Sequence, residues 1–121
     1  MSKHTCEAVI IHCIDFRLQE YLNRWPVQWL GEKNYDRVSL AGGIKDIDSV
    51  LKQVEISHRL HETRKAILIN HEDCGAYGEG ATVEQHKHDL AEARRKIETS
   101  FPGLSVETYY LHLNGTFEPM T

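Results

Sequence analysis

Short apolar runs rich in β-branched residues alternate along this chain with stretches of helical periodicity, and this alternation limits the fold more than any other feature. Strands are predicted at residues 8–13, 36–41, 66–70 and 105–113, and those at 8–13 and 66–70 are continuous apolar runs. Continuous apolar runs of this kind are typical of strands that are buried on both faces of a parallel sheet. The segments between them are long enough for right-handed helical crossovers. The sequence therefore predicts an α/β fold, a Rossmann-like three-layer arrangement in which helices flank a parallel β-sheet.

Three helices are expected between the four strands, because apolar side chains recur there at helical spacing. The first covers residues 17–31, and Pro26 is expected to break or kink it. Asp46 stands where the N-cap of the second helix belongs. Thr82 and Gln85 have the spacing of a capping box at the start of the third helix. These local signals agree with the element order that the strands indicate.

The length and charge of the chain restrict its partners. A chain of 121 residues is long enough for one hydrophobic core, so we expect a single domain over residues 1–121. The net charge is −4, which argues against nucleic-acid binding because that affinity comes largely from clustered Lys and Arg. No apolar run approaches the roughly 20 residues that span a bilayer, and the N-terminal MSKHTCEA lacks the apolar stretch of a signal peptide. We expect a cytoplasmic protein that binds neither nucleic acid nor membrane.

Chemically reactive side chains are concentrated just after three of the predicted strands. In open α/β sheets, ligands bind beyond the carboxyl ends of the strands, near the point where the strand order reverses. Residues 13–17, 41–43 and 71–75 occupy these positions, and they include two of the three cysteines. A disulfide framework is not expected in a cytoplasmic chain with an odd number of cysteines. These positions therefore point to metal binding or thiol chemistry.

Cys13, His71 and Cys74 form the donor set with the clearest chemistry. Cys13 ends the first predicted strand, and His71 and Cys74 follow the third. The first and third strands are commonly neighbours in doubly wound sheets, so we expect the three side chains to converge. Two thiolates and one imidazole suit Zn²⁺, and three protein ligands leave one tetrahedral position open, as in catalytic zinc sites.

Asp15 and Arg17 come directly after Cys13, and their spacing allows a charge-assisted pair on one side of an extended turn. A carboxylate that is held by a guanidinium stays ionised and is kept from coordinating the metal. It can then accept a hydrogen bond from a zinc-bound water or hydroxide. Because two thiolates neutralise the charge of Zn²⁺, such an acceptor is useful for orienting the nucleophile.

Three short motifs together resemble those of the β-class carbonic anhydrases. They are C-x-D-x-R at residues 13–17, Ala-Gly-Gly at 41–43 and H-x-x-C-G at 71–75, and the resemblance covers about residues 8–80. It implies a parallel sheet flanked by helices and a homodimer or higher homo-oligomer. The implied reaction is the reversible hydration of CO₂ to bicarbonate by zinc-bound hydroxide. The implied site contains one Zn²⁺ per chain, three metal ligands and a neighbouring dyad: Cys13, His71 and Cys74, with Asp15 and Arg17.

The chain departs from the family pattern in three respects. Phe16 stands where the family usually has a small Ser, and Ser39-Leu40 precede the Ala-Gly-Gly where an Arg-Asn pair is common. The chain is also short, without the family's N-terminal helical arm and much of its C-terminal region. Two alternative functions follow: a carbonyl sulfide or carbon disulfide hydrolase with the same ligands, and a zinc-binding scaffold or sensor without turnover. In a further alternative, Asp15 closes the site as the fourth zinc ligand.

Residues close to these motifs have competing interpretations. Gly42, Gly43 and Gly75 either line the substrate pocket or only allow tight turns of the backbone. A thiol phosphatase, which also places a cysteine after the first strand, would need Arg six positions beyond Cys13. Gln19 stands at that position, so this enzyme class is excluded.

The other histidines and the third cysteine have no primary role in this interpretation. Cys6 is expected to be a free thiol. His58 and His61 are three residues apart on one helix face, and a solvated or partly packed pair is favoured over a metal site. His86 falls on the apolar stripe of the third helix and is expected to be packed. His12 lies on the strand face opposite the metal ligands, and a role as a proton shuttle is the alternative to simple burial.

Overall fold

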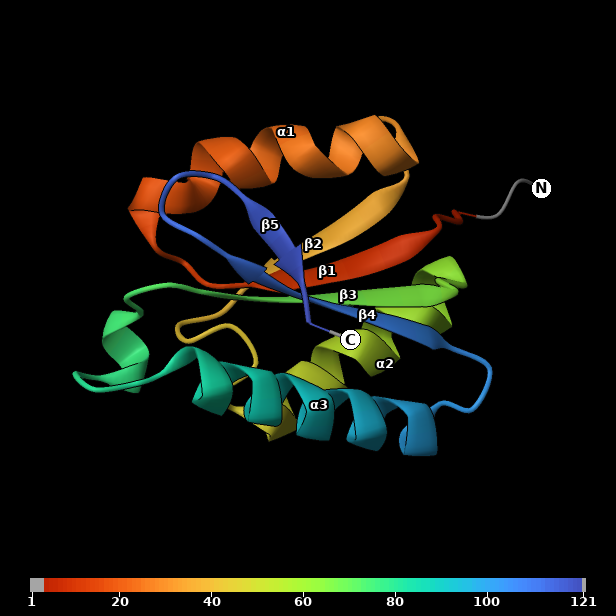
Figure 1. The fold of residues 1–121 in the computed structure, drawn as a ribbon. Helices are drawn as coiled ribbons and strands as arrows, with labels where there is room; N and C mark the ends of the chain where they lie inside the picture. Colours follow the sequence, from red (N-terminus) through yellow and green to blue (C-terminus); the bar gives the residue numbers. More distant parts are fainter. Residues whose placement is uncertain (1–3, 121) are drawn as a thin grey trace.

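The computed structural model describes residues 4–120, which form one five-stranded sheet and three α-helices (Figure 1). The elements in chain order are β1 (Ala8–His12), a 3₁₀ turn (Phe16–Leu18), α1 (Gln19–Leu30), β2 (Tyr35–Ser39), α2 (Ile47–His61), β3 (Lys65–His71), a second 3₁₀ turn (Gly75–Tyr77), α3 (Val83–Ser100), β4 (Ser105–Leu111) and β5 (Phe117–Pro119). Residues 1–3 and residue 121 lie outside the described residues. Residues 1–3 begin the N-terminal segment in which no signal peptide is expected. Within residues 4–120, no helix is both long and apolar enough to cross a membrane.

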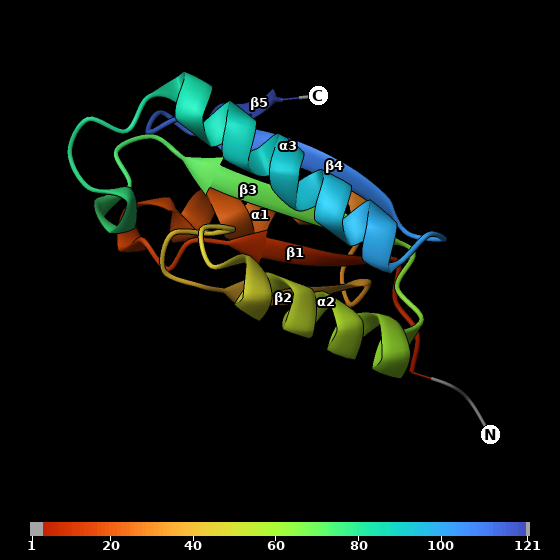
Figure 2. The same cartoon turned by 90° about the horizontal axis from the view of Figure 1, so that it is seen from below.

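The sheet has the strand order β2-β1-β3-β4-β5, and its pairings are parallel except that of β4 with β5. From β1 the chain passes through α1 to β2, then returns across β1 through α2 to β3 and continues through α3 to β4. Because such crossovers are right-handed, this reversal places α1 on one face of the sheet and α2 and α3 on the other (Figures 1 and 2). The predicted α/β fold is therefore confirmed, and the strand order reverses between β1 and β3.

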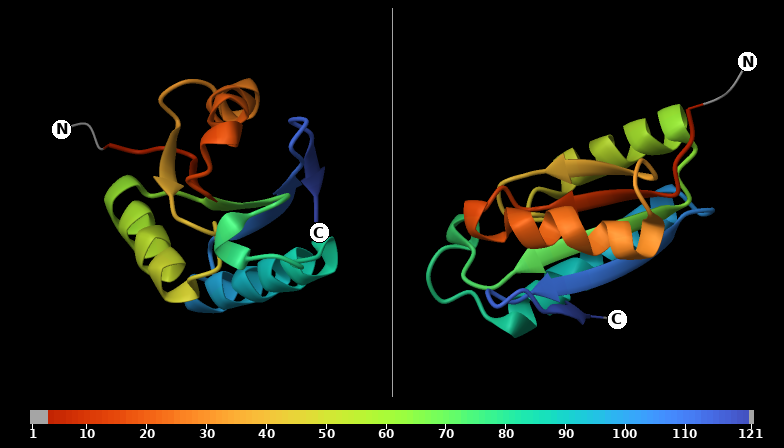
Figure 3. Two further views of the ribbon diagram at one scale, coloured as in Figure 1. Left: turned by 90° about the vertical axis from the view of Figure 1, so that its left-hand side faces the viewer. Right: turned by 90° about the horizontal axis from the view of Figure 1, so that it is seen from above.

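Apolar side chains fill the space between the sheet and the helices on each of its two faces. The end-on view in Figure 3 shows the sheet as a layer between α1 on one side and α2 and α3 on the other. Ala8 and Ile10 of β1 pack with Leu18 and Leu22 of the α1 side. Their sequence neighbours Val9 and Ile11 pack on the opposite face, against α2 and α3, among a larger buried cluster: Val50, Val54, Leu68, Leu90, Ala93 and Ile97. Since β1 is buried on both faces, it has the continuous apolar pattern from which it was predicted.

The helices begin close to the predicted positions. The Asp46 carboxylate accepts a hydrogen bond from the Ser49 amide at 3.4 Å, and the Thr82 hydroxyl accepts one from the Gln85 amide at 3.1 Å. The prediction that Pro26 breaks the first helix is wrong, because α1 continues through it to Leu30. Pro26 is buried, and the packing of α1 on the sheet outweighs the one hydrogen bond that proline cannot donate.

The antiparallel strand β5 was not predicted from the sequence. Trp25 of α1 stacks on Phe117 of β5 with ring centroids 4.3 Å apart, and it meets Tyr109 of β4 edge-on at 4.7 Å. Aromatic contacts with a distant helix therefore fix this short strand, and a local apolar pattern does not reveal them.

The turn after β2 passes very close to the end of β3. Gly42 and Gly43 both have positive φ angles, +85° and +63°. A Cβ atom on Gly43 would lie 2.5 Å from Oδ1 of Asn70 and 2.9 Å from the carbonyl oxygen of Ile69. The same Asn70 oxygen accepts a hydrogen bond from the Ile44 amide at 3.2 Å. The turn is thereby fastened to β3, immediately beside His71.

We expect Gly43→Ala to lower the free energy of unfolding by about 2–4 kcal/mol, because it combines a left-handed backbone with a steric clash. Chemical denaturation followed by circular dichroism measures the change. Gly103→Ala is the matched control, since a Cβ atom there meets nothing within 4 Å. The control should change stability by no more than about 0.5 kcal/mol. Equal losses in the two variants would contradict the close approach at Gly43.

Candidate metal centre

The three predicted metal ligands lie together at the carboxyl ends of β1 and β3. Cys13 directly follows β1, His71 is the last residue of β3, and Cys74 precedes the second 3₁₀ turn. Their donor atoms lie within 4.8 Å of one another, and all three residues are buried. The two sulfurs are 3.9 Å apart. Two thiolates that each lie ~2.3 Å from one tetrahedral ion are separated by about 3.8 Å, so the spacing fits a single small ion.

His71 has the hydrogen bonding of a metal ligand. Its Nδ1 donates a hydrogen bond to the Glu72 carbonyl oxygen at 2.7 Å, which leaves a lone pair on Nε2. Within residues 4–120, this Nε2 is the one buried side-chain nitrogen or oxygen without a hydrogen-bond partner. An unpartnered buried nitrogen is costly, and metal coordination would satisfy it. A hydrogen bond from the other ring nitrogen to a carbonyl is the usual support of a metal-bound imidazole.

The Cys13 thiol lies in an environment that favours its thiolate. Burial raises its pKa, but His71 and the backbone amides of Gly42 and Asp15 outweigh burial and bring the pKa down to about 7. The Gly42 amide donates to the Cys13 Sγ at 3.3 Å. Burial and the charge of Cys13 raise the pKa of the Cys74 thiol. A divalent cation would remove the repulsion between the two sulfurs, because thiolates are the metal-binding form of cysteine.

Asp15 is held beside these ligands by Arg17. The guanidinium donates from Nη2 to Asp15 Oδ2 at 2.7 Å and from Nε to Oδ1 at 3.0 Å. These hydrogen bonds from Arg17 outweigh partial burial and lower the pKa of Asp15 to about 2. The carboxylate therefore stays ionised at neutral pH, and its Oδ2 lies 3.8 Å from Nε2 of His71.

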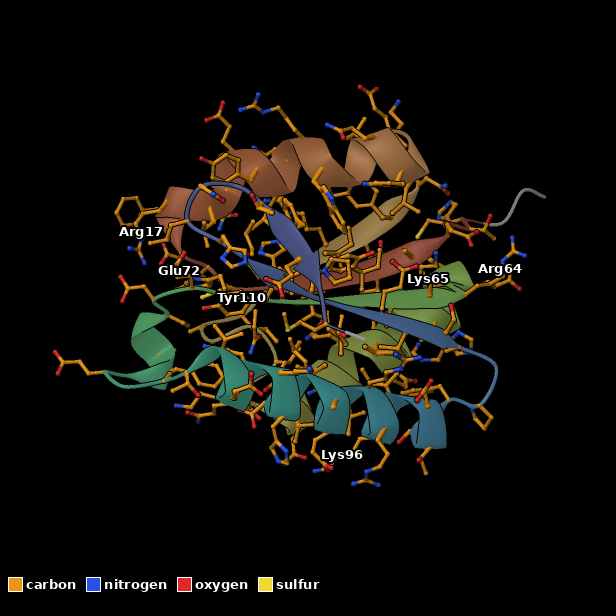
Figure 4. The ribbon with its side chains drawn as sticks, in the orientation of Figure 1. Arg17, Arg64, Lys65, Glu72, Lys96 and Tyr110 are labelled. Carbon is orange, nitrogen blue, oxygen red and sulfur yellow. The ribbon has the colours of Figure 1, made fainter. Side chains whose placement is uncertain are left out.

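Asp73 is a second partner of Arg17 that the motif spacing did not reveal. Arg17 donates from Nη1 to the Asp73 carboxylate at 3.1 Å and from Nη2 to its carbonyl oxygen at 2.9 Å. Since Asp73 lies between His71 and Cys74, one guanidinium links the segment after β1 to the segment after β3. Figure 4 shows Arg17 at this end of the sheet, on the same side as Glu72.

A pocket of about 620 Å³ opens beside the Asp15–Arg17 dyad. Its lining combines the dyad with apolar and small residues: Cys13, Ile14, Asp15, Phe16, Arg17, Ala41, Asp73, Gly75 and Ala76. Phe16 is 86% exposed and Ile14 is 59% exposed. Because the Phe16 ring lies in solvent, it does not crowd the dyad, although the related enzymes usually have Ser there.

The three glycines considered for the pocket occupy different places. Gly75 lines it. Gly42 instead donates its amide to the Cys13 sulfur, and Gly43 packs against Asn70. The turn at 41–43 thus serves the ligand Cys13 and the backbone geometry more directly than it serves the pocket.

A buried polar network behind Cys13 holds the backbone that carries it. His12 donates from Nδ1 to the Cys13 carbonyl at 2.8 Å, and its Nε2 accepts from Arg37 at 2.7 Å. Gln19 donates from Nε2 to the carbonyls of Cys13 and Asp15 at 3.2 and 2.8 Å, and its Oε1 accepts from Arg37 at 2.9 Å. Burial lowers the pKa of His12, and the Arg37 charge adds to this effect. With both ring nitrogens engaged, His12 positions the turn and has no free nitrogen for the proton-shuttle alternative.

We expect the Asp15 carboxyl of the metal-free protein to titrate near pH 2, and Arg17→Met to raise its pKa toward the ordinary value of 3.8. Because the folded-state pKa is depressed, the carboxylate stabilises the fold above pH ~4, and this contribution is lost as the pH falls through ~2. NMR titration of the side-chain carboxyl carbons measures the shift. Arg24→Met, which removes a similar exposed ion pair with Glu20 on α1, is the control. An unchanged Asp15 titration in Arg17→Met would contradict the dyad.

Comparisons with known proteins agree with this geometry. The profile of a family described as "Putative carbonic anhydrase" matches residues 3–121. An uncharacterized protein of Rickettsia conorii is 31% identical over an alignment of 130 positions that covers 92% of this chain and 70% of that protein. A second, from Rickettsia bellii, is 29% identical over an alignment of 130 positions that covers 92% of this chain and 79% of that protein.

Solved structures share the fold at low sequence identity. A carbonic anhydrase from Glaciozyma antarctica has a TM-score of 0.73 and 18% identity, with 100% of this chain and 85% of that chain covered. Tetrameric β-carbonic anhydrases from Sordaria macrospora have a TM-score of 0.64 and 11% identity, with 98% of this chain and 81% of that chain covered. The apo form of a carbon disulfide hydrolase has a TM-score of 0.63 and 12% identity, with 93% of this chain and 76% of that chain covered. The likeness to these structures concerns the fold alone, whereas the profile spans nearly the whole sequence, and the chain therefore belongs to the family described as "Putative carbonic anhydrase".

Proposed function

We propose that this protein is a zinc-dependent carbonic anhydrase that hydrates CO₂ reversibly to bicarbonate. One observation carries the proposal: two buried sulfurs and an unpartnered imidazole nitrogen lie within 4.8 Å of one another, beside a carboxylate that is bound by arginine. The donor set suits Zn²⁺, and three ligands leave one tetrahedral position for solvent.

The residues of the centre have distinct roles in this reaction. Cys13, His71 and Cys74 would hold Zn²⁺, which would supply the Lewis acidity that makes water nucleophilic near neutral pH. Asp15 accepts a hydrogen bond from the attacking water and so orients it toward the substrate carbon. Arg17 keeps the Asp15 carboxylate ionised and engaged, so that it acts as an acceptor and does not become a metal ligand.

The pocket suits a small, nonpolar substrate. Ile14, Ala41 and Ala76 contribute an apolar wall next to the charged dyad. CO₂ has no net charge and is only weakly hydrated, so it leaves water for an apolar wall at little cost, whereas the product bicarbonate is better solvated in bulk water. Carbonyl sulfide and carbon disulfide have the same linear shape, and the fold is shared with a carbon disulfide hydrolase. Direct assays with both substrates therefore belong to the test.

Cys74→Ala and His71→Ala should each bind one zinc per chain fewer than the wild type and lose CO₂ hydration, because each removes a ligand of this centre. Arg17→Met should retain the wild-type zinc content but lose activity by about 10–100-fold, because the orienting carboxylate is released. Elemental analysis of the purified variants measures the metal, and stopped-flow hydration of CO₂ measures the activity. Arg24→Met is the control variant, and both properties should remain at wild-type level.

Three outcomes would contradict this assignment. A zinc content of Cys74→Ala equal to that of the wild type would show that the ligand set is wrong. A wild-type protein that holds zinc at this centre but hydrates no CO₂ above the buffer rate would support a scaffold or sensor. Release of hydrogen sulfide from carbon disulfide, without CO₂ hydration, would identify the hydrolase alternative.

The centre works in a homo-oligomer in this proposal. Phe16 and Ile14 are large, exposed apolar side chains at the mouth of the pocket. Burying one such side chain against a second copy contributes about 1.5–3 kcal/mol. An interface at this mouth would also exclude water from the pocket.

Sedimentation velocity should therefore show a homodimer or larger assembly, and Phe16→Ser should raise its dissociation constant by at least about tenfold. Leu60→Ser is the control, since Leu60 is 55% exposed on α2 and lies outside this mouth. Monomeric wild-type protein, or equal weakening by both substitutions, would contradict an interface at Phe16.

A further inference from the structure

A second group of metal-ligand side chains lies at the opposite end of the sheet from Cys13. Cys6 precedes β1, Asp36 belongs to β2, and His61 is the last residue of α2. Their donor atoms lie within 4.8 Å of one another. Six residues lie between Cys6 and Cys13, five of them in β1, and such a stretch corresponds to roughly 20 Å. In Figure 4 this is the end marked by Arg64 and Lys65, away from Arg17.

The backbone holds this group together without help from an ion. The Cys6 amide donates a hydrogen bond to the His61 carbonyl at 3.1 Å, so the two ligand-bearing segments are joined directly. Asp36 Oδ2 lies 2.6 Å from Nδ1 of His61 and accepts a hydrogen bond from the Ser57 hydroxyl at 2.6 Å. The three donor side chains are thus placed before any metal arrives.

A shallow pocket of about 220 Å³ lies at these residues, and a fourth donor lines it. Its lining includes His4, Cys6, Asp36 and His61, together with Lys33 and Tyr35. His4 is two residues from Cys6, so the short segment can offer one imidazole and one thiolate to the same ion. The resulting set of one sulfur, one carboxylate oxygen and two imidazoles is suitable for tetrahedral Zn²⁺.

The charges of the group also favour a divalent cation. A thiolate and a carboxylate together carry two negative charges, which match the charge of Zn²⁺. Burial and the nearby Asp36 carboxylate raise the pKa of the Cys6 thiol. A bound cation would compensate the carboxylate and stabilise the thiolate, and Lys33, which also lines the pocket, adds one opposing positive charge.

We propose that Cys6, Asp36 and His61, with His4 as the fourth ligand, form a second and structural Zn²⁺ site. Four protein ligands occupy all tetrahedral positions and leave none for water, as in structural zinc sites. The ion would tie the segment before β1 to the edge strand β2 and to the end of α2. This site is independent of the catalytic proposal, because it shares no residue with the Cys13 centre.

A variant without the first centre tests the second alone. In Cys13→Ala/Cys74→Ala, Cys6 is the remaining cysteine, since the chain has three. Titration with Co²⁺ should give a thiolate-to-metal charge-transfer band that saturates at one ion per chain. Adding Cys6→Ala should abolish the band, and adding His61→Ala should weaken binding by at least about tenfold. His88→Ala, which removes an exposed histidine of α3, should leave the titration unchanged.

A folded double variant that shows no band, or a band that survives Cys6→Ala, would overturn the proposal. Saturation at half an ion per chain would also overturn it, because the ion would then be shared between two copies. If circular dichroism shows that the double variant is unfolded, elemental analysis of zinc-loaded protein decides instead. Two ions per wild-type chain and one per Cys6→Ala chain support the second site, and one ion in each overturns it.

Discussion

The parallel pairing of β1 with β3 is the interaction on which the candidate centre depends. The register places Ile11 opposite Leu68, so that Cys13, the residue after β1, comes close to the end of β3. His71 is the last residue of β3. A shift of this register by one residue would turn the alternating side chains to the opposite faces of the sheet and separate the ligands. Burial of both strands on both faces makes such a shift very costly, because every apolar contact of β1 would change.

Polar side chains hold the backbone of the Cys13 turn in place, so that this predicted ligand is held as firmly as a residue within a strand. Arg37 of β2 bonds both His12 and Gln19, and these two side chains hold the carbonyls of the Cys13 turn. A buried network of this kind is costly when one member is missing, so each member favours the same backbone position. The turn would therefore not need to rearrange in order to bind an ion. Preorganisation of this sort is what ligand supports supply in metal sites.

The sequence predicted most of the fold and the convergence of Cys13, His71 and Cys74, because both depend on local patterns that the topology then brings together. Buried strands give apolar runs, and ligands of α/β proteins follow such strands. Pro26 and β5 were misjudged because tertiary packing decides them: a buried proline ring in one case, and the Trp25–Phe117 stack in the other. The positioning roles of Gln19 and Arg37 were not predictable, since their partners are backbone carbonyls and a histidine ring whose placement only the fold determines. Cys6 had no partner in sequence because Asp36 and His61 reach it from separate elements.

The two groups at the ends of the sheet contain the same kinds of side chain, and the partner of the carboxylate separates their chemistry. Asp15 is bound by Arg17 through two of its nitrogens, so its oxygens are occupied by a cation that is part of the protein. In the proposed centre, a carboxylate in this state would remain beside the ligands as an acceptor and leave one coordination position open. Asp36 is bonded by a serine hydroxyl and a histidine ring, which are neutral or titratable partners that a divalent ion can displace or share. Arginine cannot give up its charge at any pH that the fold survives, whereas histidine can. The permanent cation beside Asp15 therefore favours a solvent-accessible centre at Cys13 in our proposal. The displaceable partners of Asp36 favour a closed site at Cys6.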